Sequence, residues 1–289
     1  MLHFYQNLPS YINPVAFTVG SFSIRWYALS YLVGFGVAYW LLIWRVKRGE
    51  YGNQNLKSQI TSKIRDTKYE IQNTISDFLL IAFFSSLIGG RIGYVLFYDL
   101  PYFLTHPLTV ISPYDSGSGK FVGIYGMSYH GALLGIIIGS WIFLRFKKID
   151  FLQWADFVAP AAALGYFFGR VGNFLNGELY GRVTNSPLGM YFAEDNLLRH
   201  PSQLYEAILE GLVLFAILWK MRKMRLQPGT LFVTYMVGYG LFRILIEQFR
   251  QPDPQVGFLL NYLTLGQFLS SFMVVGGMII LIILKKRKQ

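Results

Sequence analysis

The sequence predicts an all-α integral membrane protein with about seven transmembrane helices, its N-terminus outside and its C-terminus cytoplasmic. Only 14% of the 289 residues are charged and 53% are hydrophobic, whereas a soluble domain of this size carries nearer a quarter charged residues. Apolar stretches near the roughly 20 residues that cross a bilayer as a helix recur along the chain. Basic residues follow alternate stretches, and this spacing gives the orientation.

The apolar stretches divide the chain into spans and connections. We place the spans at Phe17–Trp44, Asp77–Phe97, Ser128–Leu144, Phe151–Asn176, Ser202–Trp219, Thr230–Phe249 and Leu265–Leu284. We expect them to form one polytopic membrane domain over residues 1–289. Residues 45–73, rich in Lys, Gln, Asn and Ser, are expected to form a cytoplasmic connector. Residues 98–127 and 177–201 are expected to form outward-facing loops.

The net charge of +11 is concentrated in four short basic blocks that adjoin the predicted spans. The blocks are Arg45–Lys68, Arg145–Lys148, Lys220–Arg225 and Lys285–Lys288. They follow the first, third, fifth and seventh spans, so all four lie on one side. Because Lys and Arg collect on the cytoplasmic side of membrane proteins, that side is the expected cytoplasm. This placement argues against nucleic acid as the partner.

Several kinds of site are excluded or disfavoured by composition. The chain has no cysteine, which excludes disulfides, thiolate metal sites and a cysteine nucleophile. Its four histidines are scattered without metal-ligand spacing, so we expect no metal site. No basic segment precedes the first apolar run, so we expect no cleaved signal peptide.

Four arginines, at positions 25, 91, 170 and 243, lie inside or at the edges of apolar spans. An arginine at the centre of a membrane helix costs roughly 2.5–3.5 kcal/mol on insertion scales, so these side chains should face a polar interior. Their shared sign would attract an anion, and phosphate matches the planar guanidinium fork. Arg91 either binds substrate or balances an acidic residue such as Asp156.

A polar stripe follows the sixth span. Tyr239, Arg243, Glu247 and Arg250 recur at spacings of four, four and three, which places them on one helical face. The stripe would run from near mid-bilayer to the outer interface. An ion pair that only holds helices together is the alternative. One glutamate cannot neutralise two arginines, so we favour anion binding.

The densest polar segment ends the fourth span, at residues 169–182. Arg170 and Asn173 share a helical face, and Gly177 and Gly181 allow the backbone to leave the helix. Together with Glu178, such a helix end can surround an anionic head group with donors. Packing alone would explain the glycines of this span, but not its arginine, amide and carboxylate.

Three further motifs carry polar or small residues. His130 stands at the outer start of the third span, where it is either a structural residue or a base that works near neutral pH. Gly89 and Gly93 have the spacing typical of close helix packing. Residues 199–206 open the fifth span, where Gln203 and Glu206 can orient other polar groups.

With these motifs, the chain resembles the prolipoprotein diacylglyceryl transferase family over nearly its whole length. The most specific match is GRVGNFLNGELYGR at residues 169–182. Supporting matches lie at residues 25–27, 89–94, 128–130, 199–206 and 238–250. The departures are modest: Arg25 stands where some relatives have histidine, and the connector at 45–73 is longer than usual.

The resemblance implies that phosphatidylglycerol donates its diacylglyceryl group to the lipobox cysteine thiol of a prolipoprotein, leaving a thioether and releasing glycerol phosphate. It implies a bacterial inner (plasma) membrane location, with the active site toward the outer face. No cofactor is expected, because the phospholipid supplies its own leaving group. Arg170 and Arg243 are expected to bind the head group. Eight other residues are implied to be important: Tyr27, His130, Asn173, Glu178, Gly181, Tyr239, Glu247 and Arg250.

Two points stay open at the level of sequence. His130 is the first candidate for the base that takes the thiol proton, and Tyr239, flanked by two arginines, is the alternative. A transporter or channel for a phosphorylated anion would need polar residues that continue to the cytoplasmic face. A membrane scaffold with structurally paired charges would tolerate Arg-to-Lys changes, which a bidentate phosphate site would not.

Overall fold

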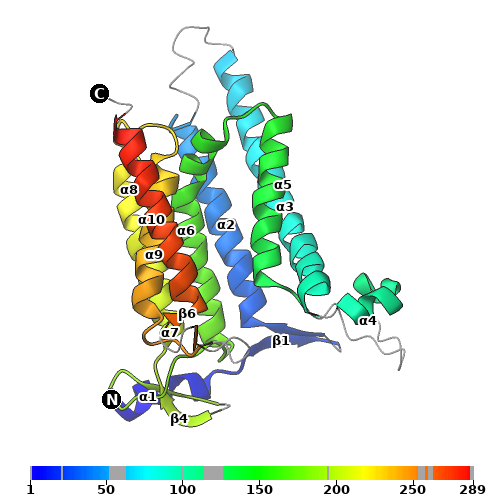
Figure 1. Ribbon diagram of the computed structural model, residues 1–289, viewed down its shortest axis with the longest axis vertical. Helices are drawn as coiled ribbons and strands as arrows, with labels where there is room; N and C mark the ends of the chain where they lie inside the picture. The colour runs from blue at the N-terminus through cyan, green and yellow to red at the C-terminus, as the bar shows by residue number, and fades with distance from the viewer. Residues whose placement is uncertain are drawn as a thin grey trace. The chain divides into compact units, whose positions relative to one another are not determined.

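The computed structural model describes residues 2–20, 22–51, 63–98, 100–112, 126–193, 195–252, 258–259 and 263–286, and they are mostly helical (Figure 1). The chain divides into two compact units. Unit 1 consists of Met1–Tyr51 and Leu152–Gln289, and unit 2 is Gly52–Phe151.

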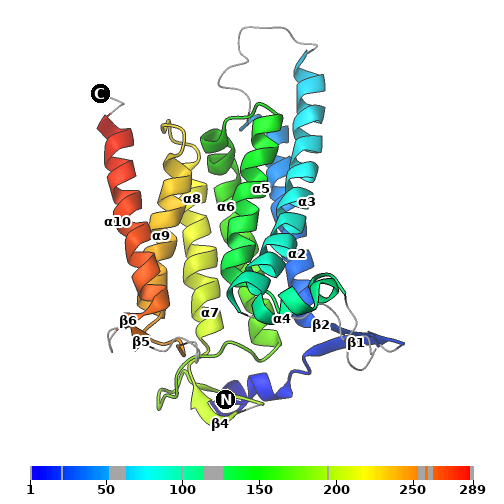
Figure 2. The same ribbon diagram turned by 45° about the vertical axis from the view of Figure 1, so that its right-hand side comes forward.

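Unit 1 contains long helices that run lengthwise alongside one another, with its hairpins gathered at one end (Figures 1 and 2). The long helices are α2 (Trp26–Lys47), α6 (Phe151–Leu175), α9 (Thr230–Ile246) and α10 (Leu265–Lys286). Another helical run joins α7 (Ser202–Glu206), the π-helical segment η3 (Ala207–Val213) and α8 (Leu214–Met221). The short helices α1 (Leu2–Gln6) and η1 (Leu8–Tyr11) complete the described helices of this unit.

Three antiparallel hairpins occur among the described residues of unit 1. They pair β1 (Val15–Val19) with β2 (Phe22–Arg25), β3 (Met190–Phe192) with β4 (Asp195–Arg199), and β5 (Phe258–Leu259) with β6 (Leu263–Thr264). The sequence predicted an all-α protein, so these hairpins show that the prediction was incomplete.

The core of unit 1 fixes α6 against α8 and α9. Ala159 and Ala163 of α6 pack with Leu214, Leu218 and Leu231, all of them buried. Small side chains on α6 allow the larger leucines of its neighbours to approach.

Asp156 adds a polar link between α6 and α9, since its carboxylate accepts backbone N–H bonds from Gly229 at 2.7 Å and Phe232 at 2.8 Å. The acidic residue that the sequence offered as a partner for Arg91 therefore caps the start of α9.

Unit 2 is built on two helices that lie side by side, α3 (Lys63–Phe97) and α5 (Tyr129–Phe146), with the short α4 (Leu100–Thr105) and η2 (Pro107–Val110). A Cβ atom on Gly89 would lie 2.7 Å from the Cα of Gly135, and one on Gly93 would lie 2.8 Å from the Cα of Gly131. The predicted packing role of these two glycines is thus confirmed.

Several helices have the length and polarity of membrane spans. Among the described residues, Trp26–Lys47, Tyr69–Phe97 and Leu265–Lys286 are long and apolar enough to cross a bilayer, and Gly131–Phe146 and Thr230–Ile246 are shorter apolar helices. Twenty-two residues of α helix extend about 33 Å, close to the thickness of a hydrocarbon core. The fold is that of a helical membrane protein.

The first predicted span, Phe17–Trp44, was placed too early. Residues 17–20 and 22–25 belong to the β1–β2 hairpin, in which Gly20 has a φ of +61°, and the helix begins at Trp26. The hairpin is rich in Val, Phe, Ser and Thr, and hydropathy alone cannot distinguish an apolar strand from an apolar helix. Arg25 is exposed at the end of this hairpin and does not lie within a span.

Other boundaries also shift. The predicted connector at 45–73 is partly helical, because α3 begins at Lys63 with a run of good helix formers; residues 52–62 lie outside the described residues. The predicted loop at 98–127 contains α4 and η2, and residues 113–125 are likewise outside the description. The loop at 177–201 contains the β3–β4 hairpin, and the fifth span contains η3.

Candidate active site

One face of α6 carries the polar residues of the site. Tyr166, Arg170 and Asn173 follow spacings of four and three, so their side chains share a face. On α6, Gly172 permits close approach of α2, because a Cβ there would lie 2.8 Å from Ser30 Cβ and 3.4 Å from Tyr27 Cα. The glycine spacing therefore serves packing and brings α2 against the polar end of α6.

Two carboxylates approach this face from the neighbouring helical run. Glu206 ends α7 and Glu210 lies in the π-helical segment, a rare geometry that occurs frequently at functional sites. The hydroxyl oxygen of Tyr166 lies 3.1 Å from Oε2 of Glu206 and 2.5 Å from Oε2 of Glu210. Tyr166 thus connects the two carboxylates.

Arginines from two elements meet at Glu206. Its Oε2 lies 2.8 Å from Nε of Arg170 and 3.0 Å from Nη1 of Arg243. Oε1 of Glu247 lies 2.9 Å from Nη2 of Arg243 and 3.4 Å from Nη1 of Arg250. Arg250 also approaches Glu206, at 3.7 Å. The result is a continuous network of ion pairs, which we call the arginine–glutamate cluster: Arg170, Glu206, Arg243, Glu247 and Arg250.

The cluster is deeply placed. The side chains of Glu206 and Glu247 are 0% and 1% exposed, while those of Arg170 and Arg243 are 14% and 12% exposed. Buried charges of this kind are tolerated where each has an opposite charge and hydrogen bonds. Removing one partner would leave the others uncompensated.

The sequence argument from charge was therefore wrong in one respect. It counted a single glutamate beside the arginines of the sixth span, and the structure adds Glu206 and Glu210 from the fifth. These residues are distant in sequence, as with Arg243 and Glu206, which are 37 residues apart. Glu206 and Glu247 therefore balance part of the positive charge of the arginines.

Part of each guanidinium nevertheless remains available. Arg170 donates from Nη1 to Asn173 Oδ1 at 3.3 Å. Among the described residues, no acceptor is bonded to Nη2 of Arg170 or to Nε of Arg243. A guanidinium has five N–H donors in a fixed fork, so the glutamates hold one part of each fork and leave donors for a bound anion.

The segment after α6 forms a rigid turn beside the arginines. Glu178 accepts from Asn173 Nδ2 at 2.8 Å and from Asn176 Nδ2 at 2.9 Å, and its backbone carbonyl accepts from Gln203 Nε2 at 2.6 Å. Gly177 adopts a left-handed conformation, with φ of +70°. The structure thus brings Arg170, Asn173 and Glu178 together, as the sequence predicted.

Gly181 has a packing reason that the sequence did not reveal. A Cβ there would lie 2.8 Å from the carbonyl oxygen of His200 and would also contact that of Phe249. The amide of Gly181 donates to His200 at 2.8 Å, and Arg182 Nε donates to the carbonyl of Arg250 at 2.8 Å. These contacts tie together the segments that lead to Glu206 and Arg250.

His200 adds no positive charge to these segments near neutral pH. Burial lowers the pKa of its imidazole, and Nδ1 lies 3.2 Å from the hydroxyl of Tyr205. The neutral ring can therefore pack against its aromatic neighbours.

The remaining predicted residues are placed as follows. The ring of Tyr239 lies 5.8 Å from that of Tyr166 and nearly perpendicular to it. Tyr27 opens α2, is about one-third exposed and contacts Tyr31, with 4.7 Å between ring centroids. The backbone of His130 lies in the first turn of α5 in unit 2, and its side chain is outside the described part of the chain.

Arg91 takes a structural position within unit 2. Its guanidinium donates to the carbonyls of Thr109 at 2.6 Å, Val110 at 2.7 Å and Gly126 at 3.2 Å, and it lies over the ring of Phe103. The arginine therefore satisfies backbone carbonyls of η2 and of the segment that precedes α5. Of the four arginines chosen from the sequence, Arg170 and Arg243 converge on one site.

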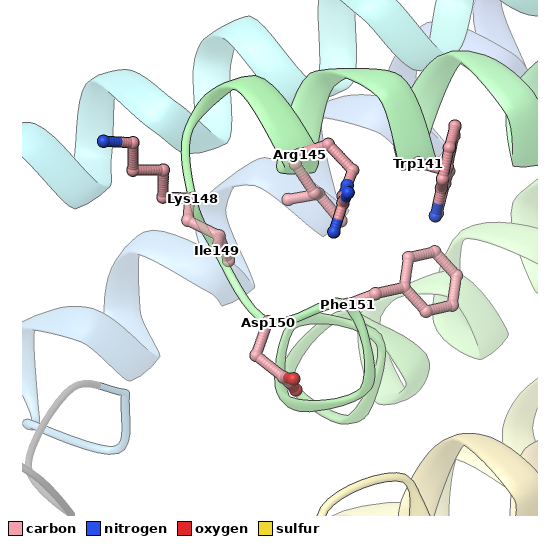
Figure 3. A pocket seen from close by; sticks show the side chains of 7 residues that line it. Trp141, Arg145, Lys148, Ile149, Asp150 and Phe151 are labelled. Carbon is pink, nitrogen blue, oxygen red and sulfur yellow. The ribbon is translucent and has the colours of Figure 1, made fainter.

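A separate cavity of about 530 Å³ lies within unit 2 (Figure 3). It is lined by residues from the end of α5, the connection that follows and the first residue of α6, among them Trp141, Arg145, Lys148 and Phe151. In Figure 3, Arg145 and Trp141 lie beside Phe151, while Lys148 points away. None of the predicted site residues lines this cavity.

Two residues of the site were not selected from the sequence, Tyr166 and Glu210. Both could have been found by helical spacing, since Tyr166 precedes Arg170 by four residues and Glu210 follows Glu206 by four. Each therefore lies on the helical face of a polar residue already identified.

Comparison with known proteins identifies the family. The model of the family described as prolipoprotein diacylglyceryl transferase matches residues 14–283. A phosphatidylglycerol–prolipoprotein diacylglyceryl transferase of Chlorobaculum tepidum is 46% identical, over 99% of this chain and 94% of its own length. Proteins with the same name from Desulfotalea psychrophila and Geobacter sulfurreducens are 41% and 40% identical, over 95% and 96% of this chain and 93% and 97% of their own lengths. The chain belongs to the prolipoprotein diacylglyceryl transferase family.

Proposed function

We propose that the protein transfers the diacylglyceryl group of phosphatidylglycerol to the lipobox cysteine thiol of prolipoproteins, in the maturation of bacterial lipoproteins. Its relatives carry the name of this reaction. The observation that carries the proposal is the pair of largely buried arginines, Arg170 and Arg243, that keep donors free beside carboxylates that hold them in place. Such a pair suits a phosphodiester in a membrane.

The proposed reaction is a displacement at carbon. The cysteine sulfur attacks the glyceryl carbon that carries the phosphate ester, a C–S bond forms, and the C–O bond to phosphate breaks. Glycerol phosphate leaves with the bonding electrons, so negative charge grows on the phosphate oxygens. Donors already oriented toward those oxygens stabilise the transition state in a site of low dielectric constant.

Each residue of the cluster has a role in this proposal. Arg170 and Arg243 bind the phosphate, while Glu206 and Glu247 orient their guanidinium groups. The fixed carboxylate of Glu178 and the amide of Asn173 orient the hydroxyl groups of the head-group glycerol.

Three further predicted residues complete the site. Arg250 joins Arg243 through Glu247 and adds positive charge at the end of α9. Tyr27 lies on α2 against the polar end of α6, where it can border the head group. Gly181 holds the adjoining segments together.

A base takes the proton of the thiol. His130 is the first candidate, since neutral histidine can accept a proton near neutral pH. Tyr239 is the second, because it lies on α9 one turn before Arg243 and beside Tyr166. The chemistry needs no metal or cofactor, because the phospholipid contains the leaving group.

We also propose that residues 1–289 form one domain in the bacterial inner membrane, with about seven spans and an outward-facing active site. One end of unit 1 carries the C-terminal ends of α2, α8 and α10, which lead into basic blocks (Figures 1 and 2). The hairpins lie at the other end of this unit. Arg170 and Arg243 lie toward the hairpin ends of α6 and α9. Because Lys and Arg collect on the cytoplasmic side of membrane proteins, the end that leads into the basic blocks is the proposed cytoplasmic end.

Arg170→Lys should reduce the rate of transfer about 10-fold to 100-fold. Lysine keeps the positive charge, but its single ammonium group cannot pair with Glu206 and also donate two hydrogen bonds to a phosphate. The measurement is the diacylglyceryl mass gain of a one-cysteine lipobox peptide incubated with purified protein and phosphatidylglycerol. Arg145→Lys, an exposed change in unit 2, is the control and should keep wild-type activity.

The same assay separates the competing functions. Wild-type activity of Arg170→Lys would show that the charge of Arg170 is structural and that this residue does not bind phosphate through a guanidinium fork. Folded wild-type protein that neither binds phosphatidylglycerol nor modifies the peptide would favour a scaffold. Folded wild-type protein that binds phosphatidylglycerol without modifying the peptide would favour lipid binding or transport.

The base is identified by comparing His130→Asn with Tyr239→Phe. If His130 takes the proton, His130→Asn lowers kcat by about 100-fold or more, while Tyr239→Phe has a much smaller effect. His106→Asn, an exposed histidine stacked on Tyr102, is the control. The opposite ranking would identify Tyr239 as the base. Retention of kcat in both variants would exclude both residues as the base.

The orientation can be tested directly because the chain has no cysteine. Leu188→Cys and Met224→Cys introduce thiols at positions that are 57% and 58% exposed in unit 1. A membrane-impermeant thiol reagent should label Leu188→Cys in spheroplasts and Met224→Cys only after lysis. The reverse pattern would place the active site on the cytoplasmic side.

A further inference from the structure

The site contains a buried carboxyl group to which the proposed mechanism gives no role. Glu210 is 0% exposed, and its Oε2 lies 2.5 Å from the hydroxyl oxygen of Tyr166. Its other oxygen, Oε1, is buried and has no hydrogen-bond partner among the described residues. An ionised carboxylate with so few donors would be poorly compensated in this position.

Hydrogen atoms are too few around Tyr166 if both carboxylates are ionised. The hydroxyl has one hydrogen, but its oxygen lies within hydrogen-bond distance of Glu206 and of Glu210. The third neighbour, Arg170, donates from Nε to the same hydroxyl oxygen at 2.7 Å. One of the two short contacts between Tyr166 and a carboxylate therefore lacks a hydrogen.

The distribution of ion pairs shows which carboxylate holds the additional proton. Glu206 lies within 3.0 Å of guanidinium nitrogens from Arg170 and Arg243, and Arg250 approaches it as well. Glu210 forms no ion pair with an arginine among the described residues, and its hydrogen-bond partner is Tyr166. Glu206 is thus the compensated anion.

Packing prevents Glu210 from relieving this arrangement by moving away. The next residue, Gly211, lies so close to α6 that a Cβ would be 2.7 Å from Cβ and 2.9 Å from Cα of Phe167. This close contact fixes the π-helical segment against the helix that carries Tyr166 and Arg170. The charged and titratable groups near Glu210 are Tyr166 and Arg170 from α6, Glu206 from α7, and Tyr239 and Arg243 from α9.

We propose that Glu210 is a protonated positioning residue. Its carboxyl group donates a hydrogen bond to the Tyr166 hydroxyl, which in turn donates to Glu206 and accepts from Arg170. All three short contacts then have a hydrogen. This chain of bonds fixes the orientation of the Arg170 guanidinium group.

The proton also sets the charge of the site, an argument that rests on the proposed function. With Glu210 neutral, Arg170, Arg243 and Arg250 face the two carboxylates of Glu206 and Glu247, which leaves one positive charge. A phosphodiester carries one negative charge, so phosphatidylglycerol would neutralise the cluster. An ionised Glu210 would make the empty cluster neutral and weaken its attraction for the head group.

The test uses the full-length purified protein and three variants, Glu210→Gln, Glu210→Ala and the control Glu70→Gln. Infrared spectroscopy of the substrate-free protein should contain the carbonyl band of a protonated carboxylic acid, sensitive to deuterium exchange. The band should be lost in Glu210→Gln and kept in Glu70→Gln, a change at an exposed position of α3. A band that persists in Glu210→Gln, or no such band in the wild type, would overturn the proposal.

Transfer kinetics provide the second readout. Glu210→Ala removes the donor to Tyr166 and should raise KM for phosphatidylglycerol about 10-fold. Glu210→Gln has an amide that can replace this donor, so it should restore KM to within about threefold of the wild-type value. Equal impairment of both variants would show that the charge of Glu210 is what matters, and would overturn the proposal.

Failure of the proposed function has a different signature. If the wild-type protein transfers nothing but the infrared band is lost only in Glu210→Gln, the proton assignment stands and the transferase proposal fails. If transfer proceeds but the band does not follow Glu210, the transferase proposal stands and the positioning role fails.

Discussion

The buried ion pairs of Glu206 with Arg170 and Arg243 are the interaction on which the site depends. One carboxylate from the start of the fifth helical run holds guanidinium groups from α6 and α9, so three elements are fixed by a single side chain. Because these charges are almost completely buried, losing one partner would cost about 3–5 kcal/mol. The same contacts leave N–H donors on both arginines for a ligand. The ion pairs therefore stabilise the fold and also prepare the arginines to bind an anion.

Close packing makes this arrangement possible. Gly172 admits α2 to the polar end of α6, and Gly211 admits the π-helical segment to the same helix. Gly181 and Arg182 then connect the segments that follow α6 and α9. The polar residues are therefore held by backbone contacts in which a larger side chain would not fit, and a rigid site of this kind needs little reorganisation when charge develops on a phosphate.

Helical spacing and the basic blocks were enough to predict a helical membrane protein and to group Arg170, Asn173 and Glu178. They could not predict the hairpin before Trp26, because apolar strands and helices have similar hydropathy. The carboxylate partners of the arginines were underestimated because Glu206 and Arg243 meet only in three dimensions. Likewise, Gly181 was selected as a site residue, but only the folded chain shows that neighbouring carbonyls exclude a Cβ there.

The most direct test of the account is an experimental structure of the protein with phosphatidylglycerol bound. The account predicts phosphate oxygens within hydrogen-bond distance of Nη2 of Arg170 and Nε of Arg243, with the contacts of both arginines to Glu206 retained. A phosphate bound elsewhere, with these two arginines bonded only to glutamates, would contradict the account and leave the cluster a structural one.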